Sequence, residues 1–369
     1  MKIIQADKPK IIMSNPTGKH HYFAWPTVAR LRNGKIAVVA SGFRLQHVCP
    51  FGKSVISFSE DEGEHYTLPA PVIDTPLDDR DSGILPFGES GVMVTSFNNS
   101  LEFQRNEAER SAEKEYRLSY LSLVHTDEEA RYLGSTFRIS FDNGTTFGKL
   151  YKSPITSPHG PIQLKNGNII WVGRTFSPKN AMMEDDHIAS YLLHPNDGTM
   201  EYLGRIDDVI LEGKKKLSCE PYAFELDDGT LLCHIRVQTT TEKERIFTIY
   251  QSTSYDEGKT WSKSEPILPR LGGAPSHMIR HSSGILVAVY GFRGSPFGSP
   301  PFGIKAMFSR DNGRTWDTDH FIYKHEVSLD LGYPSTVELS DGSLLTVFYA
   351  KEQQGSSAVI MQQKWRFEE

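Results

Sequence analysis

The sequence has few cysteines and no long apolar run. Its three cysteines, Cys49, Cys219 and Cys233, are an odd and widely spaced set that fits neither a disulfide framework nor a zinc site. No stretch approaches the ~20 consecutive apolar residues that a membrane-spanning helix needs. The first residues, MKIIQADKPKIIM, lack the apolar core and cleavage site of a signal peptide. We therefore expect reduced thiols, no membrane partner and a cytoplasmic protein, with export after removal of a leader as the alternative.

An excess of charge of one sign is also missing. The net charge is −6, and there is no basic surplus to indicate nucleic acid or an anionic membrane surface as a partner. What the sequence does contain is 11% aromatic residues, 30 glycines and 21 prolines. This mixture favours many short strands joined by turns over long helices.

One pattern recurs six times: an apolar run, a turn with glycine, and a second apolar run. Its turn glycines are spaced by 57, 76, 62, 55 and 58 residues. They are Gly34, Gly91, Gly167, Gly229, Gly284 and Gly342. Asn-Gly and Asp-Gly provide the positive φ of tight hairpin turns, and each interval leaves room for two further strands. The repeat predicts an all-β fold, a single six-bladed β-propeller over residues 1–369 with four strands per blade.

A second repeat, Ser-x-Asp-x-Gly-x-x-aromatic, interleaves with the first. It begins at Ser59, Ser140, Ser254 and Ser309. The aspartate caps its own turn, the glycine takes the left-handed position and the aromatic ring plugs the blade. These segments resemble the Asp boxes of sialidase-like propellers. We expect their aspartates to be structural and not catalytic.

Two further segments complete the predicted fold. Residues 98–134 fill the longest interval, and the stretch from Glu107 to Arg117 is rich in helix formers with opposite charges at i,i+4 spacing. We interpret 98–134 as a helical insertion in blade two, either a solvated excursion or a lid or subunit contact. A strand near Ile3 to Ile12 is expected to complete the last blade and so to cover a sheet edge.

The hairpin geometry predicts which side chains meet at one mouth of the channel. Residues about nine before and seven to ten after each turn glycine should gather there. The positions before the turn are Trp25, Asp81, His159, Glu220, His277 and Tyr333. The positions after it are Arg44, Arg174, Arg236 and Arg293, with Tyr349 and Lys351 in blade six. Several guanidinium groups around one mouth indicate an anionic ligand such as a carboxylate.

The segments CEPYAFELDDGTLLCHIR and LGYPSTVELSDGSLLTVFY resemble the matching blades of bacterial exo-sialidases. The resemblance implies that Tyr333 attacks the anomeric carbon and that Glu220 polarises it. It also implies that Arg236 and Arg293 bind a substrate carboxylate and that Asp81 occupies a substrate-binding position. Sialidases with a tyrosine nucleophile are a known exception to the scheme with two carboxylates.

Two departures from that family stand in blade one. Trp25, in FAWPT, occupies the place of the first arginine of the family's arginine triad, and the loop SGFRLQHVCPFGK lacks the family's acidic acid/base residue. Arg44 is a candidate to replace the arginine, and His47 or Asp81 to supply the proton, since histidine titrates near neutral pH. Arg174 and His159 are further candidates for substrate binding.

Three functions remain open at this point. The first is a retaining exo-glycosidase acting on an acidic, sialic-acid-like sugar. The second is a lyase for uronate-containing saccharides that works by β-elimination with Tyr, His and Arg, and the third is a carbohydrate-binding propeller without turnover. None of them requires a cofactor. The adjacent His20 and His21 would point to opposite sides of an extended segment, so no metal site is expected. The sequence does not predict the sugar, the linkage or the oligomeric state.

Overall fold

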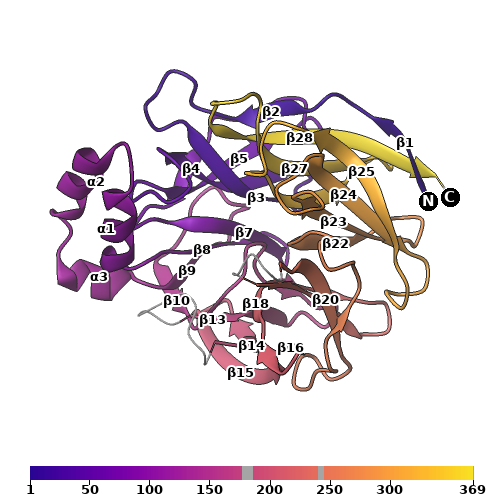
Figure 1. Cartoon of the computed structure of the whole chain (residues 1–369). Coiled ribbons are helices and arrows are strands. Elements are labelled where there is room, and N and C mark those ends of the chain that lie inside the picture. Colours follow the sequence, from indigo (N-terminus) through magenta and orange to yellow (C-terminus); the bar gives the residue numbers. More distant parts are fainter. Residues whose placement is uncertain (177–185, 240–244, 369) are drawn as a thin grey trace.

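The computed structural model describes residues 1–176, 186–239 and 245–368. Six antiparallel sheets of four or five strands form the body of this part of the chain, and all but one are built from strands that are consecutive in the sequence (Figure 1). Each sheet contacts the next through its inner strands, and these contacts close into a ring. The chain therefore forms the predicted six-bladed β-propeller.

Blades one to three consist of β3 (Tyr22–Arg30), β4 (Ile36–Arg44), β5 (Lys53–Ser59) and β6 (Ala70–Ile73), then β7 (Arg80–Phe87), β8 (Gly91–Phe97), β9 (Ser135–Ser140) and β10 (Leu150–Ser153), then β11 (Ile155–Thr156), β12 (Ile162–Gln163), β13 (Ile169–Thr175), β14 (Ile188–His194) and β15 (Thr199–Ile206). A small hairpin, β16 (Ile210–Leu211) with β17 (Lys214–Lys215), precedes blade four. Blades four to six consist of β18 (Leu217–Glu225), β19 (Leu231–Gln238), β20 (Phe247–Ser254) and β21 (Glu265–Pro266), then β22 (Ser276–Arg280), β23 (Leu286–Phe292), β24 (Phe302–Ser309) and β25 (Asp317–His325), then β26 (Gly332–Glu338), β27 (Leu344–Lys351) and β28 (Ala358–Glu368).

Glycine in the left-handed region closes the inner hairpin of each blade. In blade one Gly34 has φ +87° and its N–H donates to the Leu31 carbonyl at 2.9 Å, which makes a type I turn followed by a left-handed residue. Blade two differs from the expectation: Gly88 has the positive φ, and Gly91 begins β8. The turn there is shifted because the sequence has Gly at both ends of the loop.

The hydrophobic core is divided among the blade interfaces. Six clusters of buried apolar side chains lie one between each pair of neighbouring blades. The central strands are therefore covered on both faces, which explains why they read as continuous apolar runs such as IAVVA and LVAVYGF. The blades hold each other in place, and the positions at the mouth of the channel depend on all six.

Both N-terminal strands join the last blade. β1 (Lys2–Ala6) and β2 (Lys10–Met13) pair antiparallel with β28, and the two chain ends lie side by side in Figure 1. The expectation for the segment from Ile3 to Ile12 is confirmed. The pairing joins the two ends of the chain in one sheet, and it covers the edge that β28 would otherwise expose.

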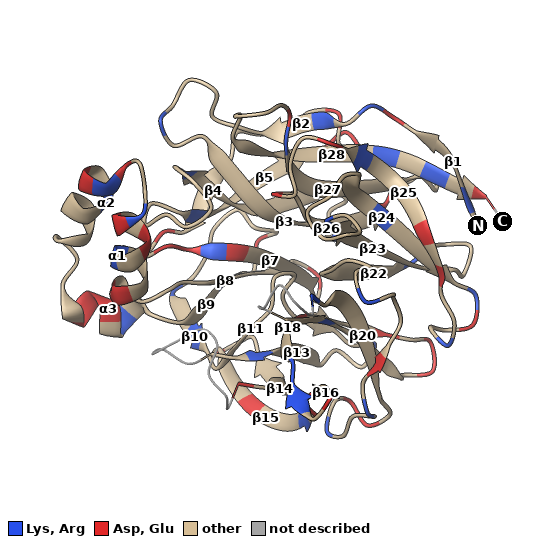
Figure 2. Ribbon diagram, viewed as in Figure 1, with Lys and Arg blue, Asp and Glu red and all other residues tan. Residues whose placement is uncertain are grey.

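Three short helices stand between β8 and β9, within residues 98–134. They are α1 (Leu101–Glu109), α2 (Lys114–Leu121) and α3 (Thr126–Tyr132). The predicted helical stretch from Glu107 to Arg117 is interrupted between α1 and α2. Figure 2 shows Asp and Glu on all three helices, and they have a core of their own. No helix of the described residues is both long enough and apolar enough to span a membrane.

Candidate functional site

Four innermost strands carry the same backbone irregularity at the channel mouth. Trp25, Asp81, Glu220 and Tyr333 have φ values of +54°, +44°, +50° and +50°, a region that residues other than glycine rarely adopt. Each of them lies within a register shift between the first and second strands of its blade. Such bulges redirect side chains and are frequent at active sites, where the strain is maintained by the surrounding fold. The repeat spacing predicted these four positions but gave no sign of the bulges.

Tyr333, Glu220 and Arg236 form one hydrogen-bonded group. The Tyr333 hydroxyl donates to Glu220 Oε1 at 2.5 Å, and Arg236 Nη1 donates to Glu220 Oε2 at 2.5 Å and to the Tyr333 oxygen at 3.1 Å. Arg236 Nε and Nη2 donate to Gln238 Oε1, two residues along the same strand and therefore on the same face. Burial and the charge of Glu220 hold the pKa of Tyr333 well above its usual value. The phenol is thus protonated at rest, and Glu220 is placed to accept its proton.

The two predicted carboxylate-binding arginines differ in how many donors they have left. Both guanidinium groups lie over the ring of Phe247, Arg236 at 4.8 Å and Arg293 at 5.0 Å from its centroid. Four of the five N–H groups of Arg236 are used by Glu220, Tyr333 and Gln238. The side chain of Arg293 forms no hydrogen bond or ion pair among the residues described, and its buried Nε is unpartnered there. Arg293 is therefore the main available donor for an anion, and Arg236 mainly orients Glu220 and Tyr333.

Asp81 is a buried carboxylate beside Glu220. Only 7% of the residue is exposed, and Oδ1 has no hydrogen-bond partner in the described part of the chain. Burial and the charge of Glu220 raise the pKa of Asp81 to about 7, although Arg80 opposes the shift. Asp81 can therefore hold or release a proton near neutral pH.

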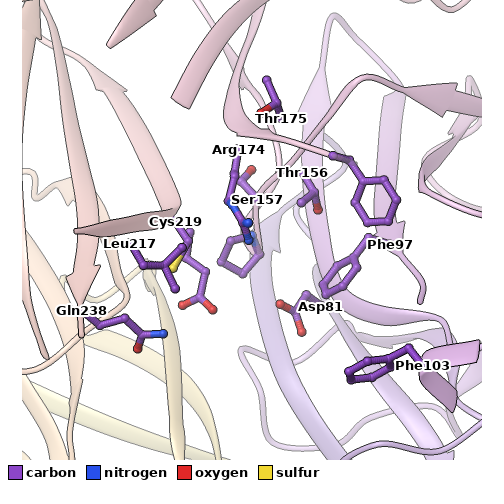
Figure 3. Close-up of a pocket in the computed structure, with 13 residues that line it drawn as sticks. Asp81, Phe97, Phe103, Thr156, Ser157, Arg174, Thr175, Leu217, Cys219 and Gln238 are labelled. Atoms are coloured by element: carbon purple, nitrogen blue, oxygen red, sulfur yellow. The ribbon is translucent and has the colours of Figure 1, made fainter. Parts of the chain in front are cut away.

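Asp81 and Glu220 line one cavity of about 390 Å³. Its other walls come from blades two, three and four and from helix α1 (Figure 3). They are Phe97, Phe103, Thr156, Ser157, Pro158, Arg174, Thr175, Phe176, Leu217, Cys219 and Gln238. The predicted residue Arg174 is thus at the cavity, and it is ion-paired with Asp186.

The structure does not place Arg44 at the cavity. Its side chain is fully buried, with Nη2 2.6 Å from Asp78 Oδ1 and further hydrogen bonds to Ser41 and to the carbonyls of Asp79 and His47. The expected replacement of the missing arginine by Arg44 is therefore not seen. Arg44 is the last residue of β4, and its side chain turns inward because Asp78 offers a buried partner.

His159 also lies elsewhere than expected. It is 1% exposed, its Nδ1 is 3.1 Å from the Thr27 hydroxyl, and its ring is edge-on to that of His277 at 5.3 Å. Burial holds the pKa of His159 well below its usual value. His159 and His277 are thus neighbours inside the channel and make no contact with Tyr333 or Glu220 that the described residues show.

His47 belongs to a second polar cluster at the mouth. Its Nδ1 lies 3.2 Å from the Tyr22 hydroxyl and 3.4 Å from Asp330 Oδ1, while half of its side chain is exposed. Asp330 also contacts Lys351 Nζ at 3.4 Å. No hydrogen bond within the described residues joins His47 to Tyr333 or Glu220. The ring of Trp25 lies between His47 and Tyr333, and the His47 carbonyl accepts a hydrogen bond from Arg80 Nη1 at 2.8 Å.

Sequence reasoning placed Trp25 at the mouth but missed Arg80, which packs on it. The ring of Trp25 lies 4.9 Å from that of His47 and 6.4 Å from that of Tyr333, and the Arg80 guanidinium covers it at 4.2 Å. Phe247 and Gln238 were missed as well. Gln238 lies two residues after Arg236 on the same strand, so the alternation of side chains along the strand could have indicated it. No local signal predicts that Arg80, next to Asp81, folds over Trp25.

The sequence matches the BNR repeat-like domain family over residues 113–347. No curated protein sequence is significantly similar to the chain. A protein of unknown function from Dyadobacter fermentans has a TM-score of 0.75 at 18% identity, over 98% of this chain and 99% of that one.

Two solved structures with named activities have the same fold. NanB sialidase from Streptococcus pneumoniae has a TM-score of 0.66 at 13% identity, over 98% of this chain and 71% of that one. The α-L-arabinanase from Penicillium chrysogenum has a TM-score of 0.61 at 12% identity, over 97% of this chain and 98% of that one. Identities this low show the shared fold alone. The prediction of a sialidase-like propeller is confirmed.

Proposed function

We propose that this chain, which belongs to the BNR repeat-like domain family, is a retaining exo-glycoside hydrolase that removes an acidic, sialic-acid-like sugar. The observation that carries the proposal is the 2.5 Å hydrogen bond from the Tyr333 hydroxyl to Glu220, with Arg236 bound to both. A binding protein has no need to bury a phenol against a carboxylate on two strained residues. The sialidase among the structural neighbours supports the choice of sugar.

The first step forms a bond between the Tyr333 oxygen and the anomeric carbon. Glu220 takes the phenolic proton as the bond to the leaving oxygen breaks, and a glycosyl-tyrosine results. A neutral phenol approaches an anionic sugar with less repulsion than a carboxylate would. The leaving oxygen needs a proton, for which Asp81 and His47 are the candidates. Water then releases the sugar, and Glu220 returns the proton to Tyr333.

The arginines give the site its preference for an anion. Arg293 offers its unpaired guanidinium to the substrate carboxylate, and Arg236 contributes its one remaining N–H group. Arg293 is half-buried over Phe247, so its charge is only partly screened by water.

The test is turnover of a panel of acidic-sugar glycosides by wild type and by Tyr333→Phe. The panel contains a sialoside, a keto-deoxy-sugar glycoside and uronate oligosaccharides, and both released sugar and ultraviolet absorbance are measured. We expect free acidic sugar without new absorbance, and a loss of at least about a thousandfold in kcat for Tyr333→Phe. Tyr255→Phe, at a side chain 81% exposed, is the matched control and should be unchanged.

Two outcomes would contradict the proposal. New ultraviolet absorbance from a uronate substrate would show a conjugated double bond and hence a lyase. Binding of an acidic sugar that Tyr333→Phe leaves intact, without turnover of any glycoside, would show a carbohydrate-binding propeller.

A further inference from the structure

The cavity beside Asp81 has a chemical character unlike that of the arginine side of the mouth. Its walls are mainly apolar, and three of them are phenylalanines: Phe97 from β8, Phe103 from α1 and Phe176. Figure 3 shows Asp81 next to the rings of Phe97 and Phe103, with Leu217, Cys219 and Gln238 across the cavity. A volume of about 390 Å³ is within the range of small-ligand sites. The cavity therefore suits a group with an apolar face.

Asp81 is placed to exchange a proton at this cavity. Its Oδ1 is buried without a partner in the described residues, and its strained backbone holds the carboxyl beside Glu220. The raised pKa, about 7, means that both protonation states are populated near neutral pH. An unpartnered buried carboxyl is costly in a folded protein, which indicates that it serves a ligand.

We infer that Asp81 is the acid/base residue of the reaction and that the cavity walled by Phe97 and Phe103 receives the leaving group. This inference rests on the proposed function. Asp81 gives its proton to the glycosidic oxygen as the C–O bond breaks, so the leaving group departs as a neutral alcohol. The Asp81 carboxylate then takes a proton from water, and the resulting hydroxide attacks the anomeric carbon and displaces the Tyr333 oxygen. Atoms and protons balance over the two steps.

The leaving group that fits is one with an apolar face, either an aromatic aglycone or the C–H face of a sugar ring. Phe103 is 37% exposed, so its ring is available for such a contact. It comes from the helical insertion, which gives residues 98–134 a role in substrate choice. His47 fits the acid/base role less well, because Tyr22 and Asp330 occupy its Nδ1 and no hydrogen bond within the described residues joins its side chain to Tyr333 or Glu220.

The test of Asp81 compares leaving groups. For Asp81→Asn we expect a loss of about a hundredfold or more with a poor leaving group such as an alkyl glycoside, and less than about tenfold in the first step with an activated 4-nitrophenyl glycoside. Azide, which attacks without a base, should restore turnover of the activated substrate and give a glycosyl azide. The limb of the pH profile that Asp81 sets should disappear. His47→Asn, the control, should affect both leaving groups equally.

The test of the cavity uses Phe103→Ala. We expect KM to rise about tenfold, the worth of one aromatic contact, for an aryl glycoside or a disaccharide and to stay unchanged for a glycosyl fluoride, whose leaving group cannot reach the phenylalanine. Leu123→Ala changes an exposed apolar side chain of the same insertion that does not line the cavity, and should leave both substrates unaffected. An equal rise for the fluoride would show that the cavity holds part of the acidic sugar, and would overturn the leaving-group assignment.

Failure of the inference differs from failure of the proposed function. If Tyr333→Phe abolishes hydrolysis but Asp81→Asn slows all leaving groups alike, or if azide has no effect, the Asp81 assignment alone is wrong. If wild type hydrolyses no glycoside of the panel, the proposed function is wrong and the assignment falls with it.

Discussion

Carboxylates stand at both faces of the propeller, and their surroundings are opposite. At the face of the hairpin turns and Asp boxes, Asp311 accepts hydrogen bonds from Thr315 and Ser309, which lower its pKa to about 2. At the mouth, Asp81 is buried with an unpartnered oxygen and its pKa is raised to about 7. Antiparallel strands reverse direction at every turn, so these sites lie at opposite ends of each blade.

Repeated aspartates therefore identify the structural turns of the fold, whereas burial and neighbouring charges identify the carboxylates that can take part in a reaction. The Asp-box aspartates accept hydrogen bonds from the backbone N–H groups of their own turns. Asp81 and Glu220 occupy strained positions in a buried setting, which the fold must stabilise elsewhere.

The largest effect on stability is expected at a charged pair beside the mouth that is not catalytic. Asp78→Asn leaves the fully buried guanidinium of Arg44 without its carboxylate, and removal of one partner of a buried pair typically costs about 3–5 kcal/mol. Denaturant unfolding measures the change. Lys35→Met, which breaks an exposed pair with Glu60 on the same blade, is the control and should change stability by less than about 1 kcal/mol. A loss as small as that control's would show that Arg44 is not held by Asp78.

The fold could be predicted from the sequence because its information is local and repeated. Each turn glycine and each Asp box specifies its own hairpin, and Gly34 and Ser59 need no distant residue to do so. The positions of Glu220 and Tyr333 followed from the same spacing, because homologous points on successive blades converge at the axis.

The rest of the site depends on contacts that no spacing encodes. Whether Arg44 faces the ligand or Asp78 depends on a partner that is distant in sequence, and the bulge that redirects Asp81 breaks the regular spacing of β7 against β8. Phe103 reaches the cavity from the helical insertion. Helix propensity predicts the helices of that insertion but not where they pack against the propeller. His159 shows this limit of the spacing argument most clearly. Counting back from the turn glycine is uncertain by one or two positions, and that difference decides whether a side chain lies at the mouth or inside the channel.

The contrast between the carboxylates of the two faces also predicts how the stability of the fold depends on pH. The folded pKa of Asp81 is about 7, above its unfolded value near 4, so its favourable contribution is complete below pH ~4 and is lost as pH rises through 7. Asp81→Asn removes the buried charge. We expect the variant to be more stable than wild type at pH 8, by up to about 4 kcal/mol, and similar to it at pH 4. Urea unfolding at the two pH values measures this. A variant less stable than wild type at pH 8 would show that the carboxylate is stabilising.

The smallest effect is expected at the opposite face. Ser309 is 2% exposed, accepts a hydrogen bond from the Gly313 N–H at 2.8 Å and donates to Asp311. Ser309→Ala leaves that N–H buried without a partner, so we expect a loss of about 1–2 kcal/mol in unfolding free energy. Catalysis should not change, because the box lies at the far end of the blade. Ser282→Ala, at an exposed turn residue, is the control for both measurements. A change in kcat for Ser309→Ala at unchanged stability would mean that the two faces are coupled, and the separation between scaffold and chemistry would then be wrong.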